Sequence, residues 1–249
     1  ATPILLVPSM LLAPVAGNLS RQLLVRWSKV LTKYALDLTV RVTHRSQQPE
    51  QYAPAHKTKG TLFVHLNQQT LMAVMLYNLA LPPVKLVVNA EFAALPFIGW
   101  TYAAQGAVPV FRQFPESAKR QLEKAVLGLK EGQDFLISIE GRRSKDGNLS
   151  PFKKGPVVMA IDAQCDIVPF MTHGEWALWP RGKWSVVPHG KIDVVLYPRI
   201  STAGLTYADR DSLLAKLRTL AEGEKASWES QNEDYLCSIE KRCNMSTDN

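Results

Sequence analysis

The feature of this 249-residue chain that most constrains its fold is an alternation of strand-like and helix-like segments between residues 61 and 171. Apolar segments that suit buried strands fall at 61–66, 84–89, 107–112, 134–140 and 167–171. Segments with helical periodicity fall between them at 70–80, 117–130 and 156–163. Such alternation is typical of α/β domains, in which right-handed helical crossovers join parallel strands. We therefore predict an α/β fold with a mostly parallel central sheet flanked by helices.

The rest of the chain adds elements at both ends of this pattern. A strand is predicted over 38–42, followed by a polar loop over 46–59, and a later strand and helix over 191–197 and 209–222. No linker divides the chain into two folding units. We predict an N-terminal membrane-associating arm and amphipathic helix over 1–42, a main α/β domain over 43–224, and a C-terminal polar helix or tail over 225–249.

The N-terminal segment has the composition of a membrane-associating element. Residues 1–17 are almost wholly apolar, but they include three prolines and are fewer than the roughly 20 residues of a spanning helix. This leaves a segment lying in or re-entering the membrane, the end of a longer span, or a packed arm. From residue 18, apolar residues recur at helical spacing with Arg21, Arg26, Lys29 and Lys33 between them. Such a helix can pack on a core or lie on an anionic bilayer, and we favour the bilayer.

Charge and cysteine content narrow the classes of partner. The chain has 29 Lys and Arg against 22 Asp and Glu, a net charge of +7, which suits an anionic membrane or phosphate-bearing substrates. No run of five basic residues and no aromatic pattern of an RNA-binding strand occurs, so we expect no nucleic-acid partner. The three cysteines form neither a disulfide framework nor a zinc motif, which favours a reducing compartment and no metal site.

Two clusters could carry chemistry at one edge of the predicted sheet. His65 ends the apolar strand 61–66, where α/β sheets place their active sites, although a lone histidine is more often structural. Glu140 to Ser144 follow the strand 134–140 and emerge at the same edge. Arginines in that block could bind a phosphate with paired hydrogen bonds, or the block could be a solvated charged turn.

Four blocks in order resemble the glycerolipid acyltransferase family, whose typical member is 1-acylglycerol-3-phosphate acyltransferase. The family's H-x4-D block falls on residues 65–70, and its second block on 106–112, preceded by Pro-Phe-x-Gly-Trp at 96–100. The block usually written F-P-E-G-T-R-S falls on 138–144, and a strand containing Val-Pro falls on 167–170. The resemblance extends from about residue 23 to residue 222.

This resemblance implies transfer of a fatty acyl group from acyl-CoA or acyl carrier protein to a lysophospholipid hydroxyl, without a metal, a bound cofactor or a covalent acyl-enzyme. An alcohol attacks a thioester only when a base removes its proton, and an imidazole with a pKa near 6.5 suits that step. The resemblance makes His65 this base. It also implies membrane association, here expected at the cytoplasmic face. The residues it assigns to the acceptor's glycerol phosphate or to the same block are Arg112, Glu140, Gly141, Arg142, Arg143 and Ser144.

The sequence departs from the family at the acid of the first block, where Thr70 replaces aspartate. The acid normally holds the histidine's tautomer and stabilises its charged form. Three outcomes follow: Thr70 serves as the partner of His65, another carboxylate such as Glu91 substitutes, or catalysis is lost and lipid binding remains. We expect the enzyme, with Thr70 in the catalytic pair.

A second departure is Arg142, where threonine is usual. It either favours a more anionic acceptor or faces solvent. A non-phosphorylated acceptor is the further alternative, and it would leave the arginines without a role.

Overall fold

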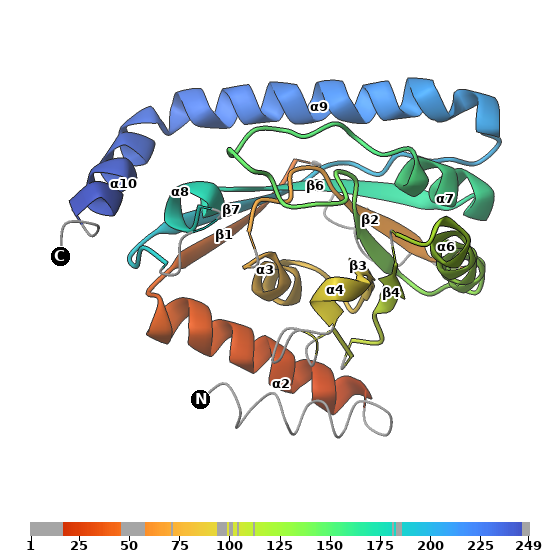
Figure 1. The fold of residues 1–249 in the computed structure, drawn as a ribbon, viewed down its shortest axis with the longest axis horizontal. Helices are drawn as coiled ribbons and strands as arrows, with labels where there is room; N and C mark the ends of the chain where they lie inside the picture. Colours follow the sequence, from red (N-terminus) through yellow and green to blue (C-terminus); the bar gives the residue numbers. More distant parts are fainter. Residues whose placement is uncertain are drawn as a thin grey trace.

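The computed structural model describes residues 17–45, 58–70, 72–93, 99, 102–103, 105–111, 113–180, 182 and 186–245. Within these ranges the centre is a seven-stranded sheet with the order β1-β7-β6-β2-β5-β3-β4 (Figure 1). Neighbouring strands are parallel except for the antiparallel pair β6 and β7. The predicted mostly parallel α/β sheet is therefore confirmed.

The elements follow the predicted alternation closely. The strands are β1 (Thr39–His44), β2 (Thr61–His65), β3 (Lys85–Asn89), β4 (Val108–Val110), β5 (Phe135–Ser138), β6 (Asp166–His173) and β7 (Lys191–Leu196). The helices are α2 (Gly17–Lys29), the π-helix η1 (Val30–Ala35), α3 (Ala73–Ala80), α4 (Ala90–Ala93), α6 (Pro115–Lys130), α7 (Gly155–Ala163), α8 (Glu175–Leu178), the 3₁₀-helix η3 (Tyr207–Asp209), α9 (Arg210–Gln231) and α10 (Glu233–Met245).

Helices cover both faces of the sheet, and the strand period of two decides which side chains each face receives. Figure 1 shows α9 along one face and α2, α3 and α4 along the other. Leu62 and Val64 pack in the cluster that includes residues of α6, α7 and α9, whereas Phe63 packs with residues of α3. His65 lies two residues beyond Phe63 and so faces α3. By the same period, Thr172 of β6 lies on the face of Phe170, which also packs with α3.

The amphipathic helix uses its apolar stripe for the core, which corrects the preference for a bilayer. Leu24 and Trp27 of α2 are 1% and 8% exposed and belong to the cluster that contains residues of α3. Arg26 and Lys29 remain exposed. Residues 1–16, on which the other part of the membrane prediction rests, lie outside the described residues. In the part of the chain that the structure describes, no helix has both the length and the apolarity needed to cross a bilayer.

Two predicted boundaries fall inside structural elements. The boundary at 42/43 divides β1, which pairs with β7 in the central sheet. The boundary at 224/225 divides α9. The C-terminal part is also more than a polar tail, because Ile239 of α10 is fully buried and the Tyr235 hydroxyl donates a hydrogen bond to the Lys191 carbonyl at 2.9 Å. The described parts of both predicted end segments, residues 17–42 and 225–245, therefore pack with the rest of the domain.

Candidate active site

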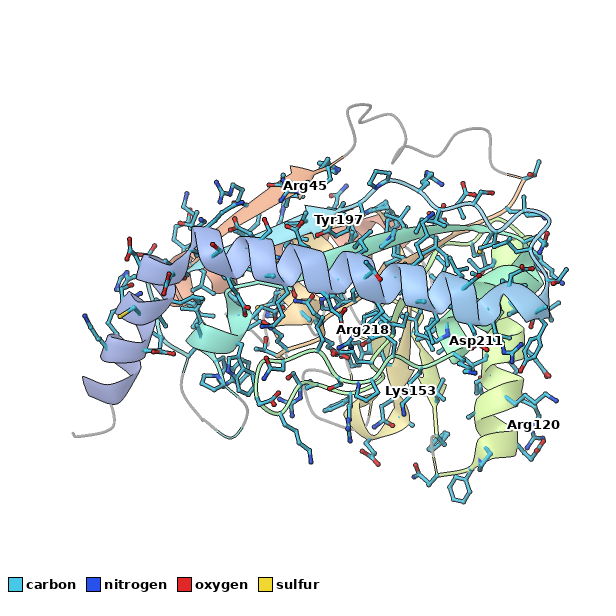
Figure 2. All side chains as sticks on the ribbon, turned by 90° about the horizontal axis from the view of Figure 1, so that it is seen from above. Arg45, Arg120, Lys153, Tyr197, Asp211 and Arg218 are labelled. Carbon is cyan, nitrogen blue, oxygen red and sulfur yellow. The ribbon has the colours of Figure 1, made fainter. Side chains whose placement is uncertain are left out.

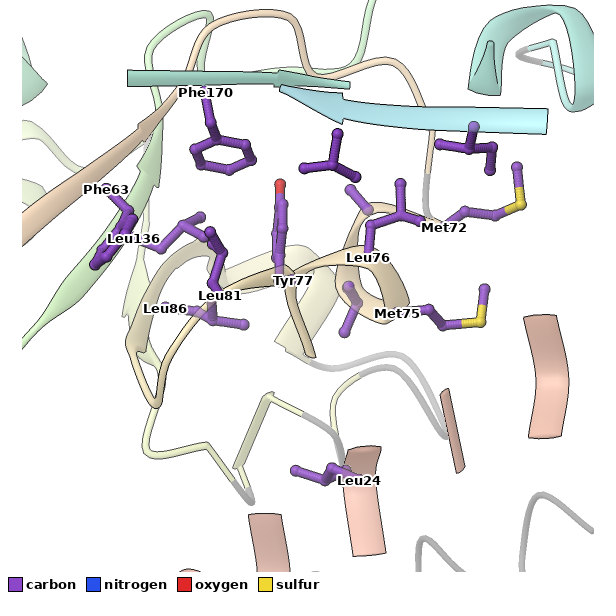
Figure 3. Packing of buried hydrophobic residues seen from close by; sticks show 14 of the residues in the cluster. Leu24, Phe63, Met72, Met75, Leu76, Tyr77, Leu81, Leu86, Leu136 and Phe170 are labelled. Atoms are coloured by element: carbon purple, nitrogen blue, oxygen red, sulfur yellow. The ribbon is translucent and has the colours of Figure 1, made fainter. Parts of the chain in front are cut away.

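His65 occupies the carboxyl end of β2 and is completely buried. Its register partner on β6 is Phe170, and the two rings stack at a centroid distance of 4.6 Å and an interplanar angle of 6°. Tyr77 of α3 approaches the imidazole edge-on, with centroids 5.5 Å apart. Figure 3 shows the Tyr77 side chain rising from α3 with its oxygen toward the sheet and Phe170 beside it. Aromatic rings from two elements, β6 and α3, thus flank the imidazole.

Both nitrogens of His65 have hydrogen-bond partners. Nδ1 lies 2.8 Å from the Tyr77 hydroxyl, and Nε2 lies 2.9 Å from Oγ1 of Thr172. Asn67, in the loop after β2, ties this loop to β6: its amide nitrogen donates to the Thr172 carbonyl at 2.6 Å, and its oxygen accepts from the Thr172 N–H at 2.9 Å. The imidazole is held in one orientation between α3 and β6.

A buried carboxyl group extends this arrangement. Glu175, the first residue of α8, is fully buried. Thr172 donates a hydrogen bond to its Oε1, and Thr70 donates to its Oε2 at 2.6 Å. The hydrogen bonds therefore form one continuous chain from Tyr77 through His65, Thr172 and Glu175 to Thr70.

The structure corrects both sequence-based candidates for the histidine's partner. Thr70 is buried at this end of the sheet, but its hydroxyl contacts Glu175 and the Met72 N–H, at 3.1 Å, and it is Thr172 that contacts the imidazole. Glu91, the carboxylate suggested as a substitute, is exposed and accepts a hydrogen bond from Asn89. The carboxylate connected to His65 is Glu175.

Burial favours the neutral forms of two members of this hydrogen-bonded chain, His65 and Glu175. Removal from water lowers the pKa of His65 to about 3. Burial also raises the pKa of Glu175 to about 7, although the hydrogen bonds from Thr172 and Thr70 favour its charged form. At neutral pH the imidazole is uncharged, and the carboxyl group is poised between its two states.

A cavity of about 500 Å³ lies beside this chain of hydrogen bonds. Its walls are largely apolar and come from β3, β5 and the segments after β3, including Leu86, Leu136, Phe92 and Tyr102. At its polar rim lie Gln68, Glu140, Gly141, Arg142 and Lys153. Tyr77 lines the cavity, whereas His65 is not among the described residues that do. Tyr77 thus contacts both the cavity and the buried imidazole.

The rim is held in place by a short network. Glu140 is 1% exposed, its Oε1 accepts a hydrogen bond from the Ser150 N–H, and its buried Oε2 has no partner among the described residues. Burial raises the pKa of Glu140 to about 8. Arg218 of α9 donates to the Ser150 carbonyl at 2.8 Å, and Figure 2 shows Arg218 and Asp211 on the side of α9 that faces the segment carrying Lys153. The long helix α9 therefore supports the loop that forms the rim.

The remaining predicted binding residues have different surroundings. Gly141 adopts a φ of +68°, a left-handed conformation that suits glycine. Arg142 is exposed at the rim, and the Arg143 guanidinium lies 5.7 Å from the centre of the Phe92 ring, which lines the cavity. Ser144 is buried and donates to the Asn148 carbonyl at 2.8 Å, so its hydroxyl stabilises the turn. Arg112 lies outside the described residues. Within the described ranges, no cluster of three or more His, Cys, Asp or Glu could hold a metal ion.

Comparison with known proteins agrees with this geometry. A family model described as Acyltransferase matches residues 39–173, more than half of the chain. The chain belongs to this acyltransferase family. The match includes β1 to β6, and with them His65, the rim block 138–144 and Thr172.

Relatives of this family member include two 1-acyl-sn-glycerol-3-phosphate acyltransferases. The chloroplastic protein of Brassica napus is 33% identical over 96 residues, which cover 39% of this chain and 28% of that protein. The protein of Pseudomonas aeruginosa is 31% identical over 100 residues, or 40% of this chain and 38% of that protein. The matched regions thus span well under half of these relatives. The crystal structure of the 1-acyl-sn-glycerophosphate acyltransferase of Thermotoga maritima shares the fold, with a TM-score of 0.68, 22% identity, and coverage of 91% of this chain and 87% of that chain.

Sequence analysis did not identify Tyr77, Thr172 or Glu175. The first lies on a mostly apolar helix, where Tyr77 and Asn78 are the residues with polar side-chain groups. The other two lie in the run Thr-His-Gly-Glu that closes a buried apolar strand, an arrangement that could have marked polar groups at the active edge. Nothing local in the sequence connects them to His65, because the connection depends on the pairing of β2 with β6.

Proposed function

We propose that this chain is an O-acyltransferase that moves a fatty acyl group from acyl-CoA or acyl carrier protein to the hydroxyl of a lysophospholipid such as 1-acylglycerol-3-phosphate. One observation carries the proposal: a single cavity joins apolar walls, a cationic rim and Tyr77, which is hydrogen-bonded to His65. Family membership supports the same conclusion. His65 is the base group of this reaction.

The cavity has the chemistry that the two substrates need. Its walls from β3 and β5 suit an acyl chain, because apolar surface leaves water there. Arg142 and Lys153 at the rim suit a phosphate, with which a guanidinium forms paired, charge-assisted hydrogen bonds. The Arg143 guanidinium near Phe92 adds a further positive charge. An amphiphile with one phosphate end and one apolar tail fits this arrangement better than a fully polar acceptor does.

Association with the cytoplasmic face of an anionic membrane is part of the proposal. Arg26 and Lys29 on α2 and Lys33 on η1 are exposed, and each basic residue near such a surface contributes about 1 kcal/mol. Tyr34, 76% exposed beside them, could enter the interfacial layer. The thiols of Cys165 and Cys237 are free, which fits a reducing compartment.

The test is acyl transfer by the purified chain in liposomes containing anionic lipid. Labelled acyl-CoA or acyl carrier protein would be supplied with lysophosphatidic acid, other lysophospholipids and a non-phosphorylated monoacylglycerol. The wild type should acylate the phosphorylated acceptors, and His65→Ala should lower turnover by about 10²–10⁴-fold. His189→Ala is the matched control, since His189 is exposed and pairs with Asp37. Equal turnover in wild type and His65→Ala would exclude His65 as the base group.

A second function is favoured by one specific observation. His65 is completely buried, with its pKa lowered to about 3, which also fits a protein that binds lysolipids at a membrane surface without transferring acyl groups. In that case the chain would bind lysophosphatidic acid in the liposomes with no labelled product. Preferential acylation of monoacylglycerol would instead indicate a non-phosphorylated acceptor and remove the proposed role of the rim cations.

A further inference from the structure

We propose that the buried chain from Tyr77 to Glu175 is a proton relay. In this relay the acceptor's proton enters at the Tyr77 hydroxyl and comes to rest on Glu175. Glu175 thereby supplies the acid that the family places at position 70. The inference rests on the proposed acyl transfer and adds two groups to it: Tyr77 as the residue that meets the substrate, and Glu175 as a positioning and proton-accepting residue behind His65.

The ionised form of Glu175 fixes the direction of every hydrogen bond in the chain. A carboxylate only accepts, so Thr172 donates its single proton to Oε1. The Thr172 oxygen must then accept from His65, which places the imidazole proton on Nε2. Nδ1 is left with a lone pair, and it accepts the proton of the Tyr77 hydroxyl. Each donor is paired with one acceptor from the cavity wall to Glu175.

Acyl transfer can use this arrangement with all protons accounted for. As the acceptor's oxygen attacks the thioester carbonyl, its proton passes to the Tyr77 oxygen and the Tyr77 proton passes to Nδ1 of His65. The Nε2 proton moves to Thr172, and the Thr172 proton moves to Glu175. Negative charge leaves Glu175 as it appears on the tetrahedral oxyanion. When the intermediate collapses, the departing thiolate takes a proton back along the same path, giving an ester and a free thiol.

The relay explains how a fully buried histidine can serve as a base. A buried imidazolium is costly, and burial lowers the pKa of His65 to about 3. In the relay His65 gains one proton as it loses another, so it exchanges tautomers and stays neutral. The group that changes charge is Glu175, whose pKa of about 7 suits proton exchange near neutral pH.

The surroundings of Glu175 contain few competing charges. Among the described residues, Tyr77 of α3 interacts electrostatically with Glu175, and His65 of β2 is linked to it through Thr172. His173, next to Thr172 on β6, points to the other face of the sheet and stacks on Trp228. Burial lowers the pKa of His173 to about 4, so it is also uncharged at neutral pH. On the other side of α8, charged residues of α9 and α10 line a separate cavity with Trp176; these are Lys225, Glu229 and Glu240.

Thr70 directs the proton to the correct oxygen of Glu175. Its hydroxyl donates to Oε2 and already accepts from the Met72 N–H, so a proton on Oε2 would leave the Thr70 proton without an acceptor. Protonation therefore occurs on Oε1, where the relay arrives. An aspartate at position 70 would instead place a second carboxylate against Glu175 at the 2.6 Å contact. The departure from the family at this position fits the presence of Glu175.

Kinetics of three variants test the relay. Glu175→Gln, Thr172→Val and Tyr77→Phe each interrupt the chain at one point, and each should lower kcat by about 10²–10³-fold with KM within about twofold of wild type. Because one break suffices, the double variant Glu175→Gln with Thr172→Val should be no slower than either single variant.

Thr172→Ser should retain most of the wild-type activity, because serine keeps the hydroxyl. Glu116→Gln, on the exposed start of α6, is the matched control. The dependence of kcat on a group with a pKa near 7 should disappear in Glu175→Gln. Full activity with an unchanged pH profile in Glu175→Gln would overturn the relay.

Nitrogen-15 NMR of the wild-type imidazoles tests the relay without a variant that must fold and without turnover. Above pH 7 His65 should be the Nε2–H tautomer, and on acidification through the pKa of Glu175 it should become the Nδ1–H tautomer. No imidazolium should form down to pH 5. A pH-independent tautomer, or an imidazolium forming near pH 6.5, would overturn the relay. A normal tautomer switch in a protein that acylates no acceptor would confirm the proton coupling and overturn the proposed function instead.

Discussion

The two sides of the candidate site handle charge in opposite ways. At the cavity rim, Arg142 and Lys153 are exposed and keep their charges in water. Farther inside, His65 and Glu175 are fully buried, and burial shifts the pKa of each so that its neutral form is favoured. The rim can attract an anion at little cost to folding, whereas in the interior burial opposes charge, and the Glu175 carboxylate is favoured there by the hydrogen bonds from Thr172 and Thr70. The first task needs local residues only, and the second needs partners from several elements.

The largest effect should come from removing the aromatic ring that encloses the imidazole. Phe170 is fully buried and stacks on His65, so Phe170→Ala should lower the free energy of unfolding by about 3–5 kcal/mol. Chemical denaturation would measure this loss. Phe114→Ala is the control, because Phe114 is 59% exposed and its removal should cost little. Similar losses in the two variants would show that the interior is less tightly packed than the structure indicates.

The next effect concerns charge in the interior. Thr70→Asp should lower the free energy of unfolding by about 2–3 kcal/mol, since two adjacent buried carboxyl groups cannot both ionise. Adding Glu175→Gln to the Thr70→Asp variant should recover most of this loss of stability. A double-mutant cycle of denaturation curves would quantify the recovery. Additive effects of the two substitutions would contradict the contact between positions 70 and 175.

A smaller effect is expected at the rim. Arg142→Ala should raise KM for a phosphorylated acceptor about tenfold, equivalent to about 1.4 kcal/mol, because one charge-assisted contact is lost. KM for monoacylglycerol and the free energy of unfolding should hardly change, since Arg142 is exposed. Arg120→Ala on the exposed side of α6 is the control. An equal rise in KM for both acceptors would show that Arg142 does not bind the phosphate of the acceptor.

The smallest effect is the pH dependence of stability. The folded-state pKa values of Glu175 and Glu140, about 7 and 8, lie above the ordinary 4.5, so their contribution is complete below pH 4.5 and is lost as pH rises through 7 and 8. His65 and His173 have lowered values, so their contribution is complete above pH 6.5 and is lost on acidification.

Of these four groups, only the two glutamates should therefore change the free energy of unfolding between pH 6.5 and 8. Stability should fall there by on the order of 1 kcal/mol for Glu175 alone. Thermal unfolding at a series of pH values would measure the slope, and Glu175→Gln should reduce it. A stability that rises with pH over this interval would be inconsistent with buried, largely neutral carboxyl groups.

The sequence by itself determined the strand and helix alternation, the mostly parallel sheet, and the position of His65 at the active edge. It did so because periodicity, turn residues and the end of an apolar strand are local properties. It also brought the block 138–144 to the same edge, since neighbouring parallel strands end together. Its preference for a bilayer as the surroundings of the α2 apolar stripe was wrong for Leu24 and Trp27, which pack in the core, because a helical apolar stripe looks the same whether it faces a core or a membrane.

Only the tertiary structure decided which groups His65 contacts. The family pattern directed attention to position 70, five residues away in the chain, and a local search suggested Glu91. The actual partners are Tyr77 from the helix that covers the sheet and Thr172 from the paired strand β6, with Glu175 three residues farther on, at the start of α8. Strand pairing between β2 and β6 joins residues more than 100 positions apart. The order of strands in the sheet, which no local pattern specifies, therefore determines where the acid of this site lies.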